Sequence, residues 1–195
     1  MFAFDFKVLC ASFAIVFAIV GFFPYFRDIF KRKTTPHLYT WLIWGITQSI
    51  AAAASWDGGG KFGAVCLVVE TILVVLIFCL TFKYGTKHIT RGDTIVLILA
   101  LMAIAVWWHM SNHLVSVLMA TSIDTMGYIP TIRKAFAEPW SETLSFWSFM
   151  ALANAFIIAS SAEYNALTVT YAAVLSIANI TVVTVCIIRR GVLKD

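Results

Sequence analysis

Two carboxylates, Glu70 and Asp124, lie deep inside apolar runs of the sequence. Glu70 follows Val68 and Val69, and Asp124 lies within the hydrophobic stretch 114–132. In lipid such a carboxylate is costly unless it is paired, protonated or placed in a wet cavity. No Lys or Arg occurs in the interior of these runs. For Glu70 this leaves protonation, hydrogen bonding or a cationic solute. For Asp124, proton binding and a structural hydrogen bond to a neighbouring helix both remain open. If transport is coupled to protons, we expect Glu70 and Asp124 to be the proton-coupling residues.

Rings and amides form a second candidate group. Trp41, Trp44 and Gln48 recur at i, i+3 and i+7, which is one face of a helix, and a later segment offers Trp147 and Asn154. Such a face suits a small polar solute, because rings stack and amides orient it. Trp41 and Trp147 equally fit the aromatic belt of a membrane interface. The predicted substrate-binding residues are Gln48, Asn154, Glu70, Asn179, Ser176 and Trp44.

Two Gly/Pro pairs could allow the helices to bend. Pro24 and Pro130 each remove a backbone donor from an apolar helix, and Gly21 and Gly127 precede them by one turn. A glycine there lets a neighbouring helix approach closely or lets the bend flex. We expect these four residues to act as hinges, with a static kink as the alternative.

The two pairs belong to an internal repeat. Residues 21–55 recur without a gap at 127–161. The matching positions carry the same Gly, Pro, Arg, Phe, Leu, Trp, Ala and Ser residues. Duplicated hydrophobic units are typical of transporters, whose binding sites lie between two repeats near the bilayer midplane.

Composition places these elements in a membrane. The chain is 61% hydrophobic and 12% charged, whereas soluble domains are about 45–50% apolar and about 25% charged. The long apolar runs lack the alternation of a β-barrel. We therefore expect an all-α integral membrane protein. The predicted spans are 5–26, 37–56, 61–83, 93–111, 113–136, 141–161 and 164–188.

Basic residues occur mainly in alternate loops. Four of the connecting or terminal segments hold Arg27 and Lys31–Lys33, Lys83 to Arg91, Arg133 with Lys134, and Arg189 to Lys194. The positive-inside rule then puts the C-terminus in the cytoplasm and the N-terminus outside. This topology accounts for the net charge of +4, so we expect no nucleic-acid partner. We expect the plasma membrane rather than an organellar one.

The repeat and the topology together predict the architecture. A three-helix unit that starts outside ends inside, so its copy needs one extra helix to start outside again. The run 93–111 has no counterpart in either repeat and is placed to be that helix. We expect seven transmembrane helices in two parallel three-helix bundles, 1–92 and 112–195, joined by the inverting linker helix 93–111.

This plan, with Gly-x-x-Pro near the end of the first helix and a basic turn after it, resembles the PQ-loop superfamily. That family includes the SWEET sugar facilitators, amino-acid exporters and the KDEL receptor. The resemblance implies transport of a small solute, a sugar or an amino acid, by alternating access, with the glycines and prolines as hinges. Asp124, just before Gly127, is similar to the acid that proton-coupled exporters of the family protonate. A receptor or sorting protein, or a structural subunit without transport, are the alternatives.

The chain also departs from the family's motifs. The Gln after the motif proline is Tyr25 in one copy and Thr131 in the other. The pocket tryptophan of small SWEET relatives falls at Ala53 and Ala159. The resemblance therefore implies transport without naming sugar as the substrate.

Other chemistry has no support in the sequence. The four cysteines fall inside apolar runs with no CxxC, which is typical of inert packed side chains. We find no Ser/His/Asp set, phosphate loop or metal spacing, and we expect no enzyme activity, metal or cofactor. The expected partners are the lipid bilayer and a small-molecule solute. Substrate identity, energy coupling and a homo-oligomeric state remain open.

Overall fold

The protein is mostly helical in the part that the computed structural model describes: residues 2–32, 36, 38–85, 91–109, 113–137 and 139–193. Within these ranges only the backbone is described at 2–5, 93, 96, 103, 107, 129, 130, 133, 134 and 141. The helices are α1 (Phe2–Phe30), α2 (Leu38–Asp57), α3 (Phe62–Tyr84), α4 (Arg91–His109), α5 (His113–Ala137), the short 3-10 helix η1 (Pro139–Ser141), α6 (Leu144–Ser160) and α7 (Ala166–Val192). The expected all-α class is confirmed, and no strand occurs in these ranges.

Each predicted span corresponds to one α-helix, with shifted ends. Two helices end four residues later than predicted: α1 continues past Pro24 to Phe30 instead of residue 26, and α7 reaches Val192 instead of residue 188. One proline removes only one intrahelical hydrogen bond, and Arg27 in the last turn interacts favourably with the helix dipole. Helix α4, predicted as the linker, begins at Arg91, slightly before the predicted boundary.

Local sequence explains the connections at one end of the molecule. The turn between α2 and α3 passes through Gly59, whose φ of 81° lies in the left-handed region that glycine adopts at little cost. Helix α7 starts with a capping box, in which the Asn165 side chain accepts from the Leu167 and Thr168 amides and the Thr168 hydroxyl accepts from the Asn165 amide.

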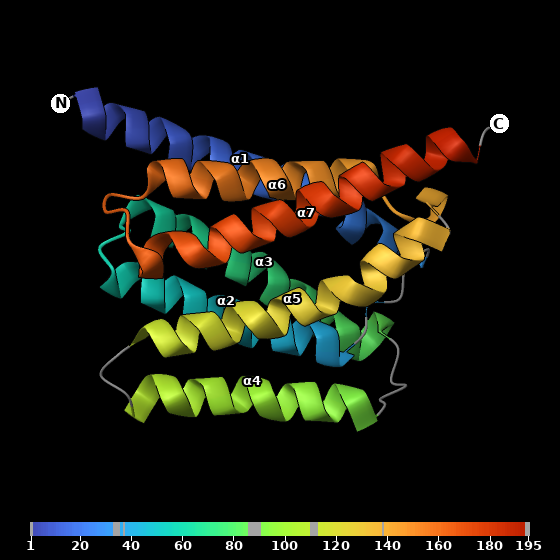
Figure 1. Cartoon of the computed structure of the whole chain (residues 1–195), viewed down its shortest axis with the longest axis horizontal. Helices are drawn as coiled ribbons and strands as arrows, with labels where there is room; N and C mark the ends of the chain where they lie inside the picture. Colours follow the sequence, from blue (N-terminus) through green and yellow to red (C-terminus); the bar gives the residue numbers. More distant parts are fainter. Residues whose placement is uncertain are drawn as a thin grey trace.

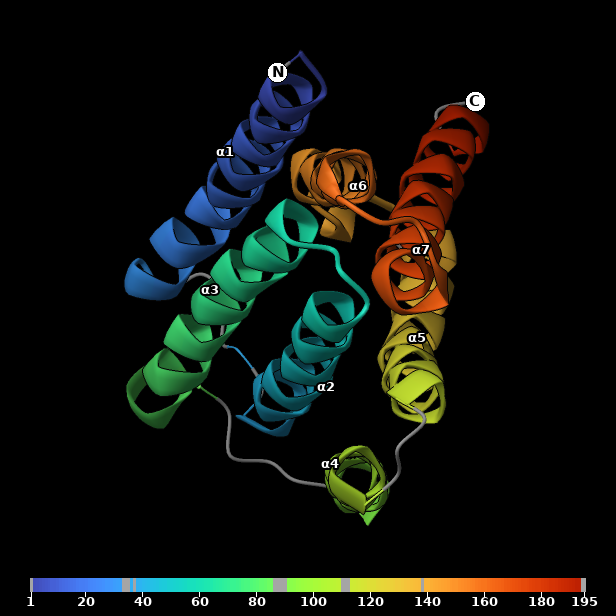
Figure 2. The same cartoon turned by 90° about the vertical axis from the view of Figure 1, so that its left-hand side faces the viewer.

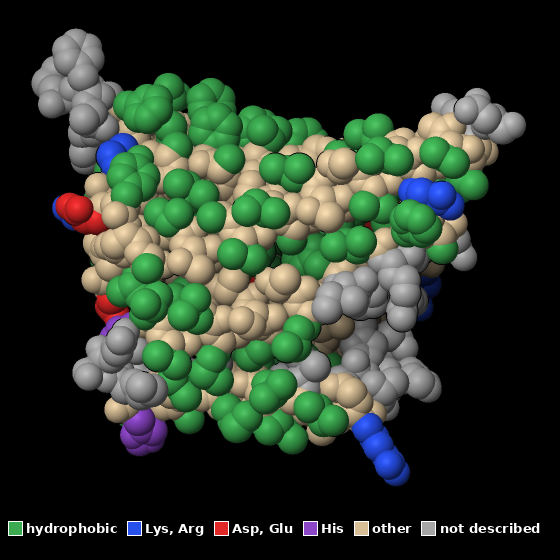
Figure 3. Space-filling view, in the orientation of Figure 1, with side chains coloured by type: hydrophobic (Ala, Val, Ile, Leu, Met, Phe, Trp, Pro, Cys, Tyr) green, Lys and Arg blue, Asp and Glu red, His purple; other side chains and the backbone are tan. Residues whose placement is uncertain are grey.

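Three of these helices are long and apolar enough to cross a membrane: Phe6–Phe30 within α1, Phe62–Tyr84 (α3) and Ala166–Val192 (α7). Shorter apolar segments occur in α4 and α6. Large hydrophobic side chains remain exposed along the bundle, among them Phe13, Ile72, Ile98 and Ile177. In the face shown in Figure 3, Lys, Arg, Asp, Glu and His side chains lie mainly at the two ends, and hydrophobic side chains are spread over the face between them.

The seven α-helices run roughly along one direction, with the two termini at opposite ends (Figure 1). The N-terminal end carries the N-terminus and the α2–α3 and α6–α7 connections. The basic end carries the C-terminus together with Arg27, Lys31, Arg32, Lys83, Arg91, Arg189 and Arg190.

Helix contacts follow a regular pattern. Helix α3 packs against α1 and α2, and α7 packs against α5 and α6. Between these groups, α1 contacts α6, α2 contacts α5, α3 contacts α6, and α2 contacts α7. Exchanging α1 with α5, α2 with α6 and α3 with α7 maps each of these contacts onto another. Helix α4 packs on α2 and α5 and lies at the edge of the bundle (Figure 2).

Candidate functional site

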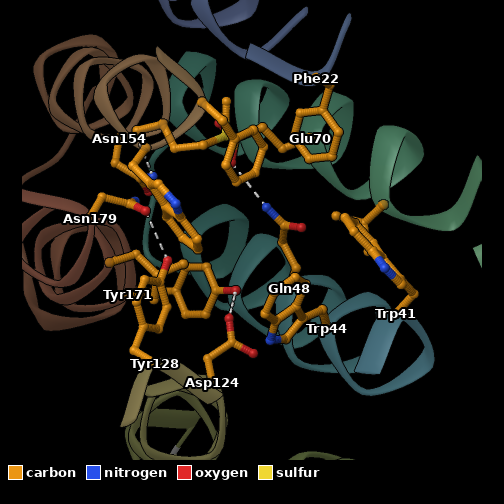
Figure 4. Close-up of a pocket in the computed structure, with 15 residues that line it drawn as sticks. Phe22, Trp41, Trp44, Gln48, Glu70, Asp124, Tyr128, Asn154, Tyr171 and Asn179 are labelled. Carbon is orange, nitrogen blue, oxygen red and sulfur yellow. Dashed lines mark hydrogen bonds between the residues drawn. The ribbon is translucent and has the colours of Figure 1, made fainter. Parts of the chain in front are cut away.

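A cavity lies between the group α1–α3 and the group α5–α7. All six helices contribute to its wall, and α4 does not. The lining residues are Phe22, Trp41, Trp44, Gln48, Glu70, Val74, Asp124, Tyr128, Phe146, Trp147, Met150, Asn154, Tyr171, Leu175 and Asn179 (Figure 4). Its volume is about 60 Å³, several times the ~10–15 Å³ that one water molecule needs. The cavity can therefore hold a few waters or a small solute.

Glu70 is a buried acid on this wall with one satisfied oxygen. Its side chain is 4% exposed. Gln48 Nε2 of α2 donates a hydrogen bond of 3.0 Å to Oε2 (Figure 4). Among the described residues, Oε1 has no hydrogen-bond partner. Glu70 therefore keeps a free acceptor at the cavity.

Asp124, 3% exposed, differs because both of its oxygens are hydrogen-bonded. The Tyr171 hydroxyl of α7 donates to Oδ2 at 2.5 Å, and the Thr47 hydroxyl of α2 is hydrogen-bonded to Oδ1. The carboxylate thus joins α5 to a helix of its own group and to one of the other group. This arrangement matches the structural hydrogen bond that the sequence left open for Asp124.

The predicted asparagines both lie on the cavity wall, but they differ in whether the side-chain oxygen has a hydrogen-bond partner. Asn154, 2% exposed, donates from Nδ2 to the Met150 carbonyl at 2.9 Å, and its Oδ1 has no partner among the described residues. Asn179 Oδ1 accepts from the Tyr128 hydroxyl at 3.1 Å (Figure 4). Free acceptors at this cavity are thus found on Glu70 and Asn154.

One predicted binding residue lies elsewhere. The Ser176 hydroxyl donates to the Ala151 carbonyl of α6 at 3.1 Å. Ser176 therefore lies at the contact between α6 and α7 and not on the cavity wall. The remaining predicted residues, including Trp44, line the cavity together.

Aromatic rings make up much of the wall. Trp41 and Trp147 are buried rather than exposed in a belt. Trp41 packs edge-on against Trp44, with ring centroids 5.2 Å apart, and Trp147 donates from Nε1 to Glu142 Oε2 at 3.0 Å. These two tryptophans therefore belong to the site.

Sequence reasoning missed four rings of this wall. They are Phe22, Tyr128, Phe146 and Tyr171. A helical spacing signal was available for both tyrosines, because Tyr128 follows Asp124 at i+4, and Tyr171 precedes Asn179 at i+8 on one face. The two phenylalanines carry no such signal in a sequence rich in phenylalanine.

The two repeat glycines occupy equivalent places in the helix packing. A Cβ atom at Gly21 of α1 would lie 2.6 Å from Met150 Cε and 3.1 Å from Phe149 Cβ of α6. A Cβ atom at Gly127 of α5 would lie 3.5 Å from Trp44 Nε1 of α2. Each glycine thus faces the second helix of the other group. Pro24 lies inside α1, whereas the side chain of Pro130 lies outside the described set.

Polar contacts join the two groups at the N-terminal end. Lys7 Nζ of α1 donates to the Ser161 carbonyl and, at 3.2 Å, to the Ala162 carbonyl. The Ala162 amide donates to the Gly60 carbonyl at 3.0 Å. Asn165 Nδ2 donates to the carbonyl of Gly58 at 2.6 Å, the residue after α2. These bonds hold the α2–α3 and α6–α7 connections together.

The arginine contacts at the basic end lie within one group of helices. Arg190 Nη2 donates to the Pro139 and Glu142 carbonyls at 2.8 and 2.9 Å, and Arg189 Nε donates to the Phe136 carbonyl at 2.8 Å. These bonds tie α7 to the last turn of α5 and to the α5–α6 connection, within one group of helices.

The titratable side chains of the cavity wall include two acids. Glu70 and Asp124 line it, and no Lys, Arg or His is among its described lining residues. Across the described part of the chain, no cluster of three or more His, Cys, Asp or Glu residues could hold a metal ion.

Comparison with known proteins adds no relative. No family model, no curated protein and no solved structure matches the chain.

Proposed function

We propose that the chain is a membrane transporter that moves a small polar solute by alternating access. The observation that carries this proposal is the cavity between two groups of three helices, walled by rings and amides and lined by two buried carboxylates. Intramembrane acids facing a bundle interior mark solute or proton pathways.

In this proposal all seven α-helices cross the bilayer. The three long apolar helices and the exposed hydrophobic side chains of the middle zone support it. The basic end faces the cytoplasm, in line with the positive-inside rule, and the N-terminal end faces outward.

The proposed architecture is two parallel three-helix bundles joined by α4, as in the PQ-loop plan. The exchange pattern of the helix contacts supports two equivalent bundles. Helix α4 lies at the edge and makes its main contacts with α2 and α5, which fits a linker between the two bundles. In such transporters the binding site lies at the interface of the repeats, where the cavity is.

Alternating access requires the two bundles to rock against each other. Hydrogen bonds between loops of different bundles hold the N-terminal end together, whereas the bonds of Arg189 and Arg190 at the basic end stay within one bundle. We infer a conformation closed at the outer end. Movement would break the outer contacts, with two pivots: Gly21, packed tightly against α6, and Gly127, in ordinary contact with α2.

A receptor on the same plan is less well supported. Holding a peptide carboxylate requires a basic cavity, and the described wall carries acids without a Lys, Arg or His. A neutral or cationic solute fits this wall better.

The test is uptake into proteoliposomes of a labelled panel that includes neutral sugars, zwitterionic amino acids and small amines. We expect at least one class to accumulate above protein-free liposomes. Gln48→Ala should lower that uptake by about ten-fold, the effect of about 1.4 kcal/mol, because it removes the partner of Glu70. Ser49→Ala, an exposed neighbour whose hydroxyl bonds the Gly45 carbonyl of its own helix, is the matched control.

A folded protein that moves no class of solute would contradict the proposal. A panel that also fails to alter its thermal stability would indicate a structural membrane subunit.

A further inference from the structure

We infer that the cavity selects small, singly charged protonated amines that carry no carboxylate, an assignment of substrate class that rests on the proposed transport function. It follows from the charge of the wall, from two unpaired oxygens and from the aromatic lining.

The first step is charge. Glu70 and Asp124 are buried on the wall, and its described residues include no cationic side chain. A buried carboxylate needs a counter-charge, a proton or strong hydrogen bonds. Asp124 already has a donor on each oxygen. Among the described residues, Glu70 has a single donor, the neutral amide of Gln48. Glu70 is therefore the acid whose missing donor and counter-charge a cationic solute would supply.

The second step is the pair of unpaired acceptors. Glu70 Oε1 and Asn154 Oδ1 both lack a hydrogen-bond partner among the described residues, and both residues line this cavity. The bond from Asn154 Nδ2 to the Met150 carbonyl assigns the other amide atom as the acceptor. An ammonium group carries three donors and no acceptor. A protonated amine therefore offers donors to both oxygens.

The third step is the aromatic wall. Seven rings line the cavity: Phe22, Trp41, Trp44, Tyr128, Phe146, Trp147 and Tyr171. The faces of tryptophan, tyrosine and phenylalanine rings attract cations, tryptophan most strongly. Such rings stabilise a compact organic cation after it has lost its water. A metal ion would instead require several oxygen ligands, which the described wall does not gather in one cluster.

The same wall disfavours the neighbouring solute classes. The carboxylate of an amino acid would meet acids and unpaired acceptor oxygens, with no described cationic side chain to pair it. A neutral polyol can donate hydroxyls to the two oxygens, but it leaves the charge of Glu70 uncompensated. A protonated amine supplies both the hydrogen-bond donors for the two oxygens and the positive charge for Glu70.

The experiment measures binding to the purified full-length protein by isothermal titration calorimetry, at fixed pH and ionic strength. The probes are ethanolamine, ethylene glycol as its neutral analogue, glycine as a zwitterion, glucose as a sugar, and tetramethylammonium as a cation without N–H groups. We expect ethanolamine to bind at least ten-fold more tightly than any other probe.

Two variants test the assignment to the site. Glu70→Gln should remove the preference of ethanolamine over ethylene glycol, whereas Glu163→Gln, an exposed acid at the N-terminal end, should keep it. Asn154→Asp places a second negative charge at the other free oxygen, and should tighten ethanolamine binding and weaken ethylene glycol binding. This gain of affinity keeps the test decisive if Glu70→Gln does not fold.

Other outcomes would overturn the assignment. Glycine or glucose binding as tightly as ethanolamine would exclude amine selectivity while leaving transport intact. Equal binding of tetramethylammonium would show that the two oxygens do not select N–H donors. A preference retained in Glu70→Gln would place the amine elsewhere. If no probe binds and no panel solute is taken up, the transport function fails as well.

Discussion

The hydrogen bond from Tyr171 to Asp124 should be the strongest polar contact of the cavity, and removing it tests how the buried acid is held. Tyr171→Phe deletes one hydroxyl that donates at 2.5 Å to a buried carboxylate and keeps the ring. Tyr128→Phe is the matched change, because its hydroxyl donates at 3.1 Å to the neutral amide of Asn179 on the same wall.

The expected difference takes Asp124 as an ionised carboxylate, whereas Asn179 is a neutral amide. Hydrogen bonds to charged groups contribute about 1.5–3 kcal/mol, whereas bonds between neutral groups of neighbouring membrane helices average about 0.6 kcal/mol. We therefore expect Tyr171→Phe to lower the free energy of unfolding by about 1–2 kcal/mol more than Tyr128→Phe. For a chain of this size, 1 kcal/mol corresponds to about 2–4 °C in the melting temperature.

The assay is unfolding of the purified protein in detergent, followed by denaturant titration and by thermal melting. Tyr164→Phe serves as a surface control, because this exposed hydroxyl bonds only the Ala159 carbonyl nearby in sequence, and it should change stability by less than about 0.5 kcal/mol. Equal losses for Tyr171→Phe and Tyr128→Phe would refute the reasoning, since they would show that Asp124 is neutral or held mainly by other groups.

The remaining predictions concern movement, coupling and orientation. Cysteines at positions 58 and 167 should form a disulfide that stops uptake until it is reduced. A Cβ built at Gly58 lies 2.8 Å from Leu167 Cβ, so the connection must move outward by about 1 Å to reach the roughly 3.5–4.5 Å of a disulfide. Uptake unaffected by the bridge would exclude opening at this end. If proton binding at the buried acids differs between the two access states, uptake should follow an imposed pH gradient. Glu70→Gln should abolish that response more completely than Asp124→Asn, because the Asp124 carboxylate of the wild type is already hydrogen-bonded on both oxygens. Gradient-independent uptake, unchanged in both variants, would make these acids structural. In a variant without native cysteines, Glu163→Cys should react with an impermeant thiol reagent added outside intact cells; labelling only after lysis would reverse the proposed orientation.

The helices themselves were predictable from the sequence, because long apolar runs bounded by Gly, Pro and charged residues require intrahelical pairing of the backbone. The run that became α3 is an example, predicted at 61–83 and found at Phe62–Tyr84. The two buried acids were visible for the same reason, since Glu70 and Asp124 interrupt otherwise apolar segments. Glycines 21 and 127 were marked by the repeat, although only the packing shows which helix each one faces.

The tertiary structure decided which acid is satisfied. Asp124 and Glu70 look alike in sequence, yet Thr47 and Tyr171 reach the first, whereas Gln48 reaches only one oxygen of the second. These partners come from other helices, and no local pattern encodes them.

The packing also decided which rings and hydroxyls line the cavity. Trp41 and Trp147 turned inward, and the Ser176 hydroxyl turned to a neighbouring backbone carbonyl. The physical reason is that the outer surface of this bundle is as apolar as its interior: Ile72 and Ile177 are exposed while Ile77 is buried. Helical periodicity distinguishes inside from outside only when the two faces differ in polarity, so helix–helix contacts alone determined the wall of the site.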